Sequence, residues 1–358
     1  MNPIKVIQFG VNGLGTEVLR LIAARPDLEL VAIIDPRAQA MTTAPADEFG
    51  VPGARPVTHG SPDALRHISA HVVTHCTDSG LAAAYPEILA VVSAGKGVIS
   101  NCAELALPWA RNSGVAAGIE SQARRTGARV LGVGAMVGFP VGMLAMAAAS
   151  GCGLIRSLTV TRLITLQPED PERLQRAGVG LSVEGFKAAV EGGAVGFAGL
   201  GEYLALAADT IGWSLDSVEE TIEPILARRK TRNGHGVIAK GAAEGLRQRA
   251  LGTIRGRQVI SIEIEASSQL ENPSDEIVID GVPPMTLRVP GGIDDLRATA
   301  ALMVSCIPAV VSLPRVGILA LHELPLAPYT AFNPAPPDPP AHGGEDEPLI
   351  VAASAENR

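Results

Sequence analysis

Near its start the chain places three glycines within six residues, between an apolar run and an amphipathic one. The run before them, IKVIQFG, is short and apolar and predicts a buried strand. After them, TEVLRLIAARP has the spacing of a helix, and LELVAIID predicts a second buried strand. A strand, a glycine turn, a helix and a strand form a βαβ unit, which leaves few choices of fold. The three glycines are Gly10, Gly13 and Gly15.

This glycine turn has the features of a dinucleotide-binding site. Glycines let the backbone turn tightly and approach a pyrophosphate, which the N-terminus of the next helix stabilises. Asp35 ends the second predicted strand, where an acidic side chain can bind a ribose 2′-hydroxyl and favours NAD. Arg37 can reach the 2′-phosphate of NADP or remain a solvated loop charge. We therefore expect NAD binding with some tolerance of NADP; the alternative is a tight turn without a ligand.

The alternation of strands and helices continues over the first third of the chain. HVVTHCTDS, GVISNCAEL and RVLGVGAMVGF are strand-like, and LAAAYPEILAVVSAGK is helical. Continuous apolar strands separated by helices indicate a parallel sheet that is covered on both faces. We predict an α/β fold in which residues 1–138 form a doubly wound, dinucleotide-binding Rossmann domain.

The pattern changes near residue 155. In VISIEIEASSQ the isoleucines share one face with Ala266, and Ser261, Glu263 and Glu265 share the other. This alternation is typical of an antiparallel sheet with one solvated face, so residues 139–295 are predicted to form a second, α+β domain on a mostly antiparallel sheet. The remaining predicted segments are 296–330, an apolar helix and a stretch returning to the first domain, and 331–358, an extended Pro- and Gly-rich tail.

The composition argues against several classes of protein. The net charge of −8, without a strong basic tract, disfavours nucleic acid as a main partner. The four cysteines are far apart and form no CxxC pair, so we expect no metal site and no disulfide framework, but free thiols in a reducing compartment. The N-terminus has no secretory signal pattern, and no uninterrupted apolar run is long enough to span a membrane. We therefore expect a cytoplasmic protein.

Five segments of the chain occur in an order that is informative when they are taken together. They are SNCAELALPW (100–109), GVGAMVGFPVGM (132–143), RLQRAGVGLSVEGF (173–186), GLGEYLALAADTIGWSLDSVEETIEPI (199–225) and GGIDDLRATAALMVSCIPAV (291–310). With them the chain resembles the 2,4-diaminopentanoate dehydrogenase family, distant relatives of dihydrodipicolinate reductase that include the native amine dehydrogenases. The resemblance implies a homodimer formed through the second domain. It also implies NAD(P)-dependent oxidative deamination of an amine, reversible as reductive amination of a carbonyl with ammonia.

The resemblance implies that Glu104 is the catalytic carboxylate. It follows the predicted strand GVIS, and ligands of doubly wound sheets bind beyond the carboxyl ends of the strands. One carboxylate in an apolar pocket can take a proton from ammonium or a carbinolamine and then stabilise an iminium cation before hydride arrives. The alternative is that Glu104 only occupies the first turn of the following helix, where the helix dipole favours an acid.

The chain departs from the family in three places. Met136-Val137 stands where the family commonly has Asn-Pro, Gly196-Phe197 where it has Gly-His, and Ser305 where it has Asn. Three polar groups thus become apolar or smaller. Because a second amino group would need polar partners, we expect a small, mainly apolar ketone or aldehyde in place of a diamine.

The other predicted site residues come from the glycine turn and the matching segments. For the cofactor they are Gly10, Asn12, Gly13, Leu14, Gly15, Asp35, Arg37, Thr77, Asn101 and Met136. For the substrate pocket they are Phe139, Arg162, Gln175, Phe197, Tyr203 and Ser305. Core packing is the alternative for Phe197 and Tyr203, and hydrogen bonding within the fold is the alternative for Arg162 and Gln175. His75, at the end of a predicted strand, either flanks the nicotinamide or has a structural role.

Other activities find less support in the sequence. Dihydrodipicolinate reductases carry a His-His segment and a nearby Lys where this chain has TVTRLITLQPEDPERLQ, which contains neither residue type. The chain also lacks the G-x-S-x-G elbow of acyl-transfer enzymes. Two alternatives stay open: a diamine or amino-acid dehydrogenase of the diaminopentanoate type, and an NAD(P)-binding protein without catalytic activity.

Overall fold

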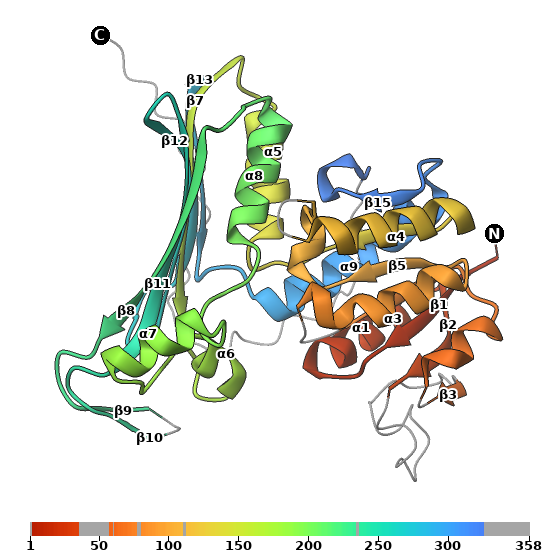
Figure 1. Cartoon of the computed structure of the whole chain (residues 1–358), viewed down its shortest axis with the longest axis horizontal. Helices are drawn as coiled ribbons and strands as arrows, with labels where there is room; N and C mark the ends of the chain where they lie inside the picture. Colours follow the sequence, from red (N-terminus) through yellow and green to blue (C-terminus); the bar gives the residue numbers. More distant parts are fainter. Residues whose placement is uncertain are drawn as a thin grey trace, which may run out of the picture. The chain divides into compact units, whose positions relative to one another are not determined.

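The computed structural model of the protein describes residues 2–35, 57–59, 61–76, 80–109, 112–233 and 236–325. Within these ranges seven strands form one parallel sheet, sheet A, in the order β15-β6-β5-β4-β1-β2-β3 (Figure 1). The strands are β1 Ile4–Phe9, β2 Leu28–Ile34, β3 Val57–His59, β4 Val72–His75, β5 Gly97–Ser100, β6 Arg129–Gly132 and β15 Gly317–Leu319. The order runs outward from β1 in both directions, which confirms the predicted doubly wound sheet.

Alternate residues of the sheet A strands face two separate apolar layers. Val6 and Val72 belong to the cluster that includes α1 and α9, whereas Ile7 and Val73 belong to the cluster that includes α3 and α4. The helices and turns of this part are α1 Gly13–Ala23, η2 Pro62–Arg66, α3 Leu81–Ser93, η3 Ala103–Ala106, α4 Ser113–Thr126 and α9 Asp295–Ser312. Burial on both faces explains why these strands read as unbroken apolar runs.

Several elements begin or end at other residues than the sequence predicts. Helix α1 starts at Gly13 instead of Thr16, because the side chain of Asn12 caps it by accepting from the Gly15 N–H. Strand β5 ends at Ser100 and strand β6 at Gly132, several residues before the predicted ends. The residues that follow both strands line the cavities described below.

Six described strands form a second sheet, sheet B, in the order β14-β13-β7-β12-β11-β8. All neighbouring pairs are antiparallel except β7 with β12, so the prediction of a mostly antiparallel sheet is confirmed. Its strands are β7 Leu154–Thr165, β8 Ser217–Leu226, β11 Ala243–Ile254, β12 Arg257–Ser267, β13 Ser274–Val282 and β14 Met285–Pro290. A small separate hairpin is formed by β9 Thr231–Asn233 and β10 Gly236–Ile238.

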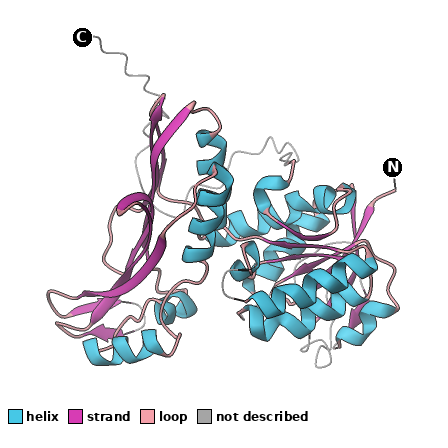
Figure 2. Cartoon of the chain, turned by 45° about the horizontal axis from the view of Figure 1, so that its top comes forward, coloured by secondary structure: helices cyan, strands magenta, loops and turns pink. Residues whose placement is uncertain are grey.

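Sheet B has one apolar and one polar face. Ile262 and Ile264 of β12 are buried in the cluster that includes α8, and α8 contacts β8, β11 and β12 (Figure 2). On the opposite face Glu265 pairs with Arg247 at 2.6 Å and Glu263 with Arg249 at 3.0 Å. The remaining elements near this sheet are η4 Gly138–Ala145, α5 Met146–Ala149, α6 Pro171–Arg176, α7 Val183–Glu191, α8 Leu200–Ile211 and η5 Leu321–Glu323.

The segment after sheet B packs on sheet A. Helix α9 contacts α1, β4, β5 and β6, and β15 pairs with β6 at the sheet edge. Among the described residues α9 is the one helix long and apolar enough to cross a membrane, but 56% of it is buried inside the protein, as in a core helix. The predicted domain boundaries stay a prediction.

Candidate active site

The glycine turn between β1 and α1 leaves no room for side chains at two of its positions. Gly10 has φ +78°, and a Cβ there would lie 2.2 Å from the carbonyl oxygen of Cys76. A Cβ at Gly15 would lie 2.2 Å from the carbonyl oxygen of Gly10. The backbone of β1, the turn and α1 therefore comes together as closely as a dinucleotide-binding turn requires.

Buried polar side chains brace the turn. The Gln8 amide donates to the carbonyl oxygen of Gly10 at 2.7 Å, and the Thr74 hydroxyl donates to Gln8 Oε1 at 2.6 Å. Asp35, which is 3% exposed, accepts from the Val11 N–H at 2.7 Å. Gln8 and Thr74 were not predicted, although each is a polar residue within an apolar strand, which indicates a hydrogen-bonding role there.

A cavity of about 590 Å³ leads from the glycine turn to the carboxyl ends of β5 and β6. Five of the predicted cofactor residues line it: Asn12, Gly13, Leu14, Asn101 and Met136. Tyr203 of α8 also lines this cavity, which we call the turn cavity. Arg37 and Thr77 lie outside the described residues, and the cofactor roles of all these residues stay a prediction.

A second cavity, of about 630 Å³, shares seven lining residues with the turn cavity: Asn101, Ala103, Met136, Asp170, Glu172, Arg173 and Ala198. Its wall includes Glu104, so we call it the glutamate cavity. Phe197 provides an apolar part of the wall, while α6 and the residues before it provide charged parts. These charged residues are Asp170, Glu172, Arg173 and Arg176. The two cavities thus meet along the residues that follow β5 and β6 and along the start of α6.

Glu104 lies in the turn η3, directly after β5. Its Oε2 accepts from the Leu81 N–H at 2.5 Å, and its Oε1 accepts from the Asn112 amide at 3.3 Å. Leu81 is the first residue of α3, whose N-cap Gly80 has no side chain to offer. Glu104 therefore caps a helix that precedes it in the sequence, which differs from the dipole interaction with its own helix considered above.

The structure places Arg162 in a buried ion-pair network, away from the walls of both cavities. Its guanidinium donates to Asp275 at 2.8 Å, to Asp295 at 2.7 Å and to the carbonyl oxygen of Met136 at 2.5 Å. Burial would lower the pKa of Arg162, but the two carboxylates outweigh it and raise that pKa. Because the N–H groups of its guanidinium all bind within the fold, Arg162 stabilises the cavity wall at Met136 and does not line the pocket itself.

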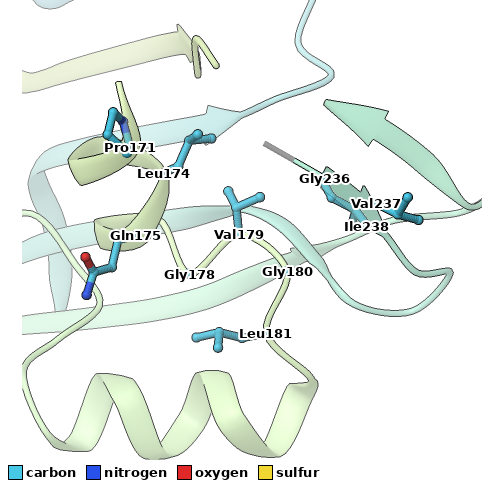
Figure 3. A pocket seen from close by; sticks show the side chains of 10 residues that line it. All are labelled: Pro171, Leu174, Gln175, Gly178, Val179, Gly180, Leu181, Gly236, Val237 and Ile238. Atoms are coloured by element: carbon cyan, nitrogen blue, oxygen red, sulfur yellow. The ribbon is translucent and has the colours of Figure 1, made fainter. Parts of the chain in front are cut away.

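The remaining predicted pocket residues divide between wall and core. Phe197 lines the glutamate cavity and Tyr203 the turn cavity, as described. Gln175 lines a hollow of about 400 Å³ together with Val179 and Ile238 (Figure 3). It also lines one of about 350 Å³ whose wall shares Glu172, Arg176 and Gly193 with the glutamate cavity. Phe139 packs against the α1–α9 cluster, and Ser305 lies within α9; neither is on the wall of the two cavities.

His75 has a hydrogen-bond partner within the fold at each of its two ring nitrogens. His75 is fully buried, with Nδ1 2.9 Å from Ser100 Oγ and Nε2 2.9 Å from Glu87 Oε2, so the structural role considered above fits it.

Cys102 lies on the wall of the glutamate cavity. Burial, helped by the negative charge of Glu104, raises the pKa of the Cys102 thiol to about 12. A neutral thiol is a poor nucleophile, which leaves Glu104 as the better candidate for proton transfer.

A family profile and a characterised relative both match this chain to the same group of dehydrogenases. The sequence profile described as the 2,4-diaminopentanoate dehydrogenase C-terminal domain matches residues 139–333, more than half of the chain. The 2,4-diaminopentanoate dehydrogenase of Acetoanaerobium sticklandii is 28% identical over 341 residues, which cover 91% of this chain and 94% of that protein.

Two solved structures share the fold. The amine dehydrogenase from Mycobacterium smegmatis has a TM-score of 0.78 at 20% identity and covers 91% of this chain and 97% of its own. A biliverdin reductase from Synechocystis, solved with biliverdin and NADP⁺, has a TM-score of 0.54 at 14% identity, with 88% of this chain and 93% of that chain covered. At such identities these two structures show the fold alone.

Proposed function

The chain belongs to the 2,4-diaminopentanoate dehydrogenase family, and we propose that it is an NAD(P)-dependent amine dehydrogenase. In this proposal it aminates a small carbonyl compound with ammonia, reversibly. The observation that carries the proposal is the position of Glu104. Its carboxylate lies on the wall of a cavity that meets, at Asn101, Ala103 and Met136, the cavity leading from the glycine turn.

The residues at the turn suit a nicotinamide dinucleotide, which would supply the hydride. Gly10 and Gly15 let β1, the turn and α1 pack closely, and Asn12, Gly13 and Leu14 line the cavity at the N-terminus of α1, where a pyrophosphate would bind. Asn12, Gly13 and Leu14 would hold the phosphates, and Asp35 the ribose. Asn101 and Met136 would border the nicotinamide end.

Glu104 would serve the substrate in two ways. It would accept a proton from ammonium or the carbinolamine, and its negative charge would then offset the iminium cation. The Leu81 N–H and the Asn112 amide fix where the carboxylate lies, so that it is positioned before the substrate enters. Phe197 and Met136 give the glutamate cavity apolar surface for a small ketone or aldehyde.

A second candidate is a dehydrogenase for amines that also carry a carboxylate, as amino acids do. Arg176 lines the glutamate cavity, and its guanidinium makes no hydrogen bond or ion pair with any residue that the structure describes. Guanidinium groups bind carboxylates in a bidentate manner. This arginine favours a carbonyl substrate with an anionic end, such as a keto acid.

The test is a panel of ketones, aldehydes and keto acids with NADH or NADPH, followed at the nicotinamide absorbance with and without ammonium. We expect oxidation of the cofactor only when ammonium is present. Oxidation without ammonium would indicate an alcohol-forming reductase. Binding of NAD(H) without turnover of any compound would favour the protein without catalytic activity.

We also propose that the protein is a cytoplasmic homodimer. The family resemblance implies dimerisation through the second domain, and sheet B offers a broad polar face with the Glu263 and Glu265 ion pairs. All four cysteines are free thiols, which suits a reducing compartment.

A further inference from the structure

Tyr203 holds a hydroxyl group that is buried and has no hydrogen-bond partner among the residues that the structure describes. Its side chain is 1% exposed. Buried polar groups in native proteins almost always have a partner, since losing water without a replacement is costly. Because the Tyr203 hydroxyl lacks a partner and lies beside a cavity, a ligand atom in that cavity can form the missing hydrogen bond with it.

Glycines on both sides leave room for the Tyr203 ring. A Cβ at Gly138 would lie 2.5 Å from the hydroxyl oxygen, and one at Gly142 would lie 3.7 Å from the near ring edge. On the other edge, a Cβ at Gly199 would lie 3.5 Å from the ring and 3.0 Å from Ala103. The absence of a side chain at Gly138 therefore lets the hydroxyl occupy this position, since a Cβ there would clash with it.

The hydroxyl is a donor under all ordinary conditions. Burial, together with the neighbouring Cys102 and Glu202, raises the pKa of the Tyr203 phenol, so it keeps its proton. Two backbone groups of the cavity wall are already engaged within the fold. The carbonyl oxygen of Met136 accepts from Arg162, and the Ala135 N–H donates to Thr299. The unpartnered Tyr203 hydroxyl can therefore donate to an acceptor atom of a bound ligand.

Tyr203 lines the turn cavity and not the glutamate cavity. Asn101 and Met136 line the same cavity at the carboxyl ends of the strands, at the far end from the glycine turn. A dinucleotide held by its pyrophosphate at the turn would place its nicotinamide at this far end. The neutral hydrogen-bonding group of a nicotinamide ring is its carboxamide, whose oxygen is an acceptor.

We infer that the Tyr203 hydroxyl donates a hydrogen bond to the carboxamide oxygen of the nicotinamide and so fixes the orientation of the ring. Tyr203 is then a positioning residue for hydride transfer, in place of the apolar wall of a substrate pocket. The inference rests on the cofactor part of the proposed function. It does not depend on which carbonyl compound is the substrate.

The test compares Tyr203→Phe with the wild type in the binding of two ligands, NAD⁺ and ADP-ribose, by calorimetry. ADP-ribose keeps the pyrophosphate and both riboses but lacks the nicotinamide. We expect the Kd for NAD⁺ to rise about tenfold, the effect of one hydrogen bond, and the Kd for ADP-ribose to stay within about twofold. Tyr85→Phe, the same chemical change on α3, is the matched control and should alter neither value.

Two further measurements separate this role from a structural one. Because the hydroxyl has no partner in the described protein, Tyr203→Phe should leave the Tm of the ligand-free protein unchanged or raise it. In the wild type, thionicotinamide adenine dinucleotide should bind more weakly than NAD⁺, because sulfur is a poorer acceptor than oxygen. In the variant the two dinucleotides should bind equally.

Several outcomes would overturn the inference. Equal losses of NAD⁺ and ADP-ribose binding, or a lower Tm without ligand, would make Tyr203 structural. Unchanged NAD⁺ binding with a higher KM for the carbonyl compound would assign the hydroxyl to the substrate. The proposed amination reaction is tested by a different result: it is rejected if the wild type binds NAD⁺ but aminates no carbonyl compound. In that case the comparison of NAD⁺ and ADP-ribose binding still decides the role of Tyr203.

Discussion

Glu104 Oε2 accepts a hydrogen bond from the backbone N–H of Leu81 at 2.5 Å, which links the turn after β5 to the first residue of α3. A Cβ at Gly80, the N-cap of α3, would lie 3.0 Å from the same oxygen, so the missing side chain there leaves room for the carboxylate. The Glu104 carboxylate thus accepts from a free N–H group at the start of α3 and also borders the glutamate cavity. Its removal has to be judged on stability and on activity separately.

The first prediction concerns the buried Arg162 network. Arg162→Met should lower the free energy of unfolding by about 3–5 kcal/mol, because it leaves two buried carboxylates, Asp275 and Asp295, without their cation. Urea unfolding measures this change. Arg156→Met is the matched control on the same strand; its ion pair with Asp280 is exposed, and we expect little change. Equal effects of the two substitutions would show that the buried network contributes no more to stability than the exposed ion pair.

The glycine turn could be predicted from the sequence, while the Arg162 network could not. The turn depends on residues that are neighbours in the chain, and its glycines, Asn12 and the two flanking strands carry local signals. The network joins Arg162 to partners 113 and 133 residues away, which only the folded chain brings together. No local pattern in the sequence distinguishes such an arginine from one that lines a pocket.

The site itself shows the same division. The position of Glu104 after β5 follows from the rule on the carboxyl ends of parallel strands. Its contacts with Leu81 and Asn112 follow from the packing of α3 and α4 and had no signal in the sequence. The strands β8 and β11 were also missed, because charged residues along β8 and glycines in β11 hide the alternation that marks a strand.

The second prediction concerns the choice of cofactor. From the turn and Asp35 we expect NAD(H) to bind with micromolar affinity, about −8 kcal/mol. Asp35→Ala should weaken NAD(H) about tenfold and NADP(H) less, since only NAD(H) offers a free ribose 2′-hydroxyl. Titration with both dinucleotides measures the difference. Because Asp35 also accepts from the Val11 N–H, the Tm of the variant is needed as a control. Equal weakening of both would mean that Asp35 only supports the turn.

The third prediction decides between the two substrate classes. If an anionic end binds at Arg176, Arg176→Met should raise the KM for a keto acid at least tenfold and leave the KM for an apolar ketone unchanged. Arg20→Met, at an exposed arginine of α1, is the control for a lost surface charge. Equal KM changes for both compounds would exclude a carboxylate site at Arg176.

The fourth prediction concerns association. Light scattering at micromolar concentration should give twice the mass of the chain, which is 36.9 kDa. Thr159→Arg adds a large charged side chain in the middle of the polar face of sheet B and should shift the mass toward the monomer. Thr210→Arg, on the exposed side of α8, should leave the mass unchanged. A monomer mass for the wild type would reject the dimer.

The last prediction tests the role of the carboxylate in catalysis. Glu104→Gln keeps the shape of the side chain and an oxygen that can accept from Leu81, so the protein should fold with a nearly unchanged Tm and still bind NAD(H). The substitution removes both the base and the negative charge, so the rate of amination should fall 10²–10⁴-fold, roughly 3–5 kcal/mol of barrier. The rate is followed at the nicotinamide absorbance with saturating ammonium. A variant that keeps most of its amination rate would show that Glu104 serves only to cap α3.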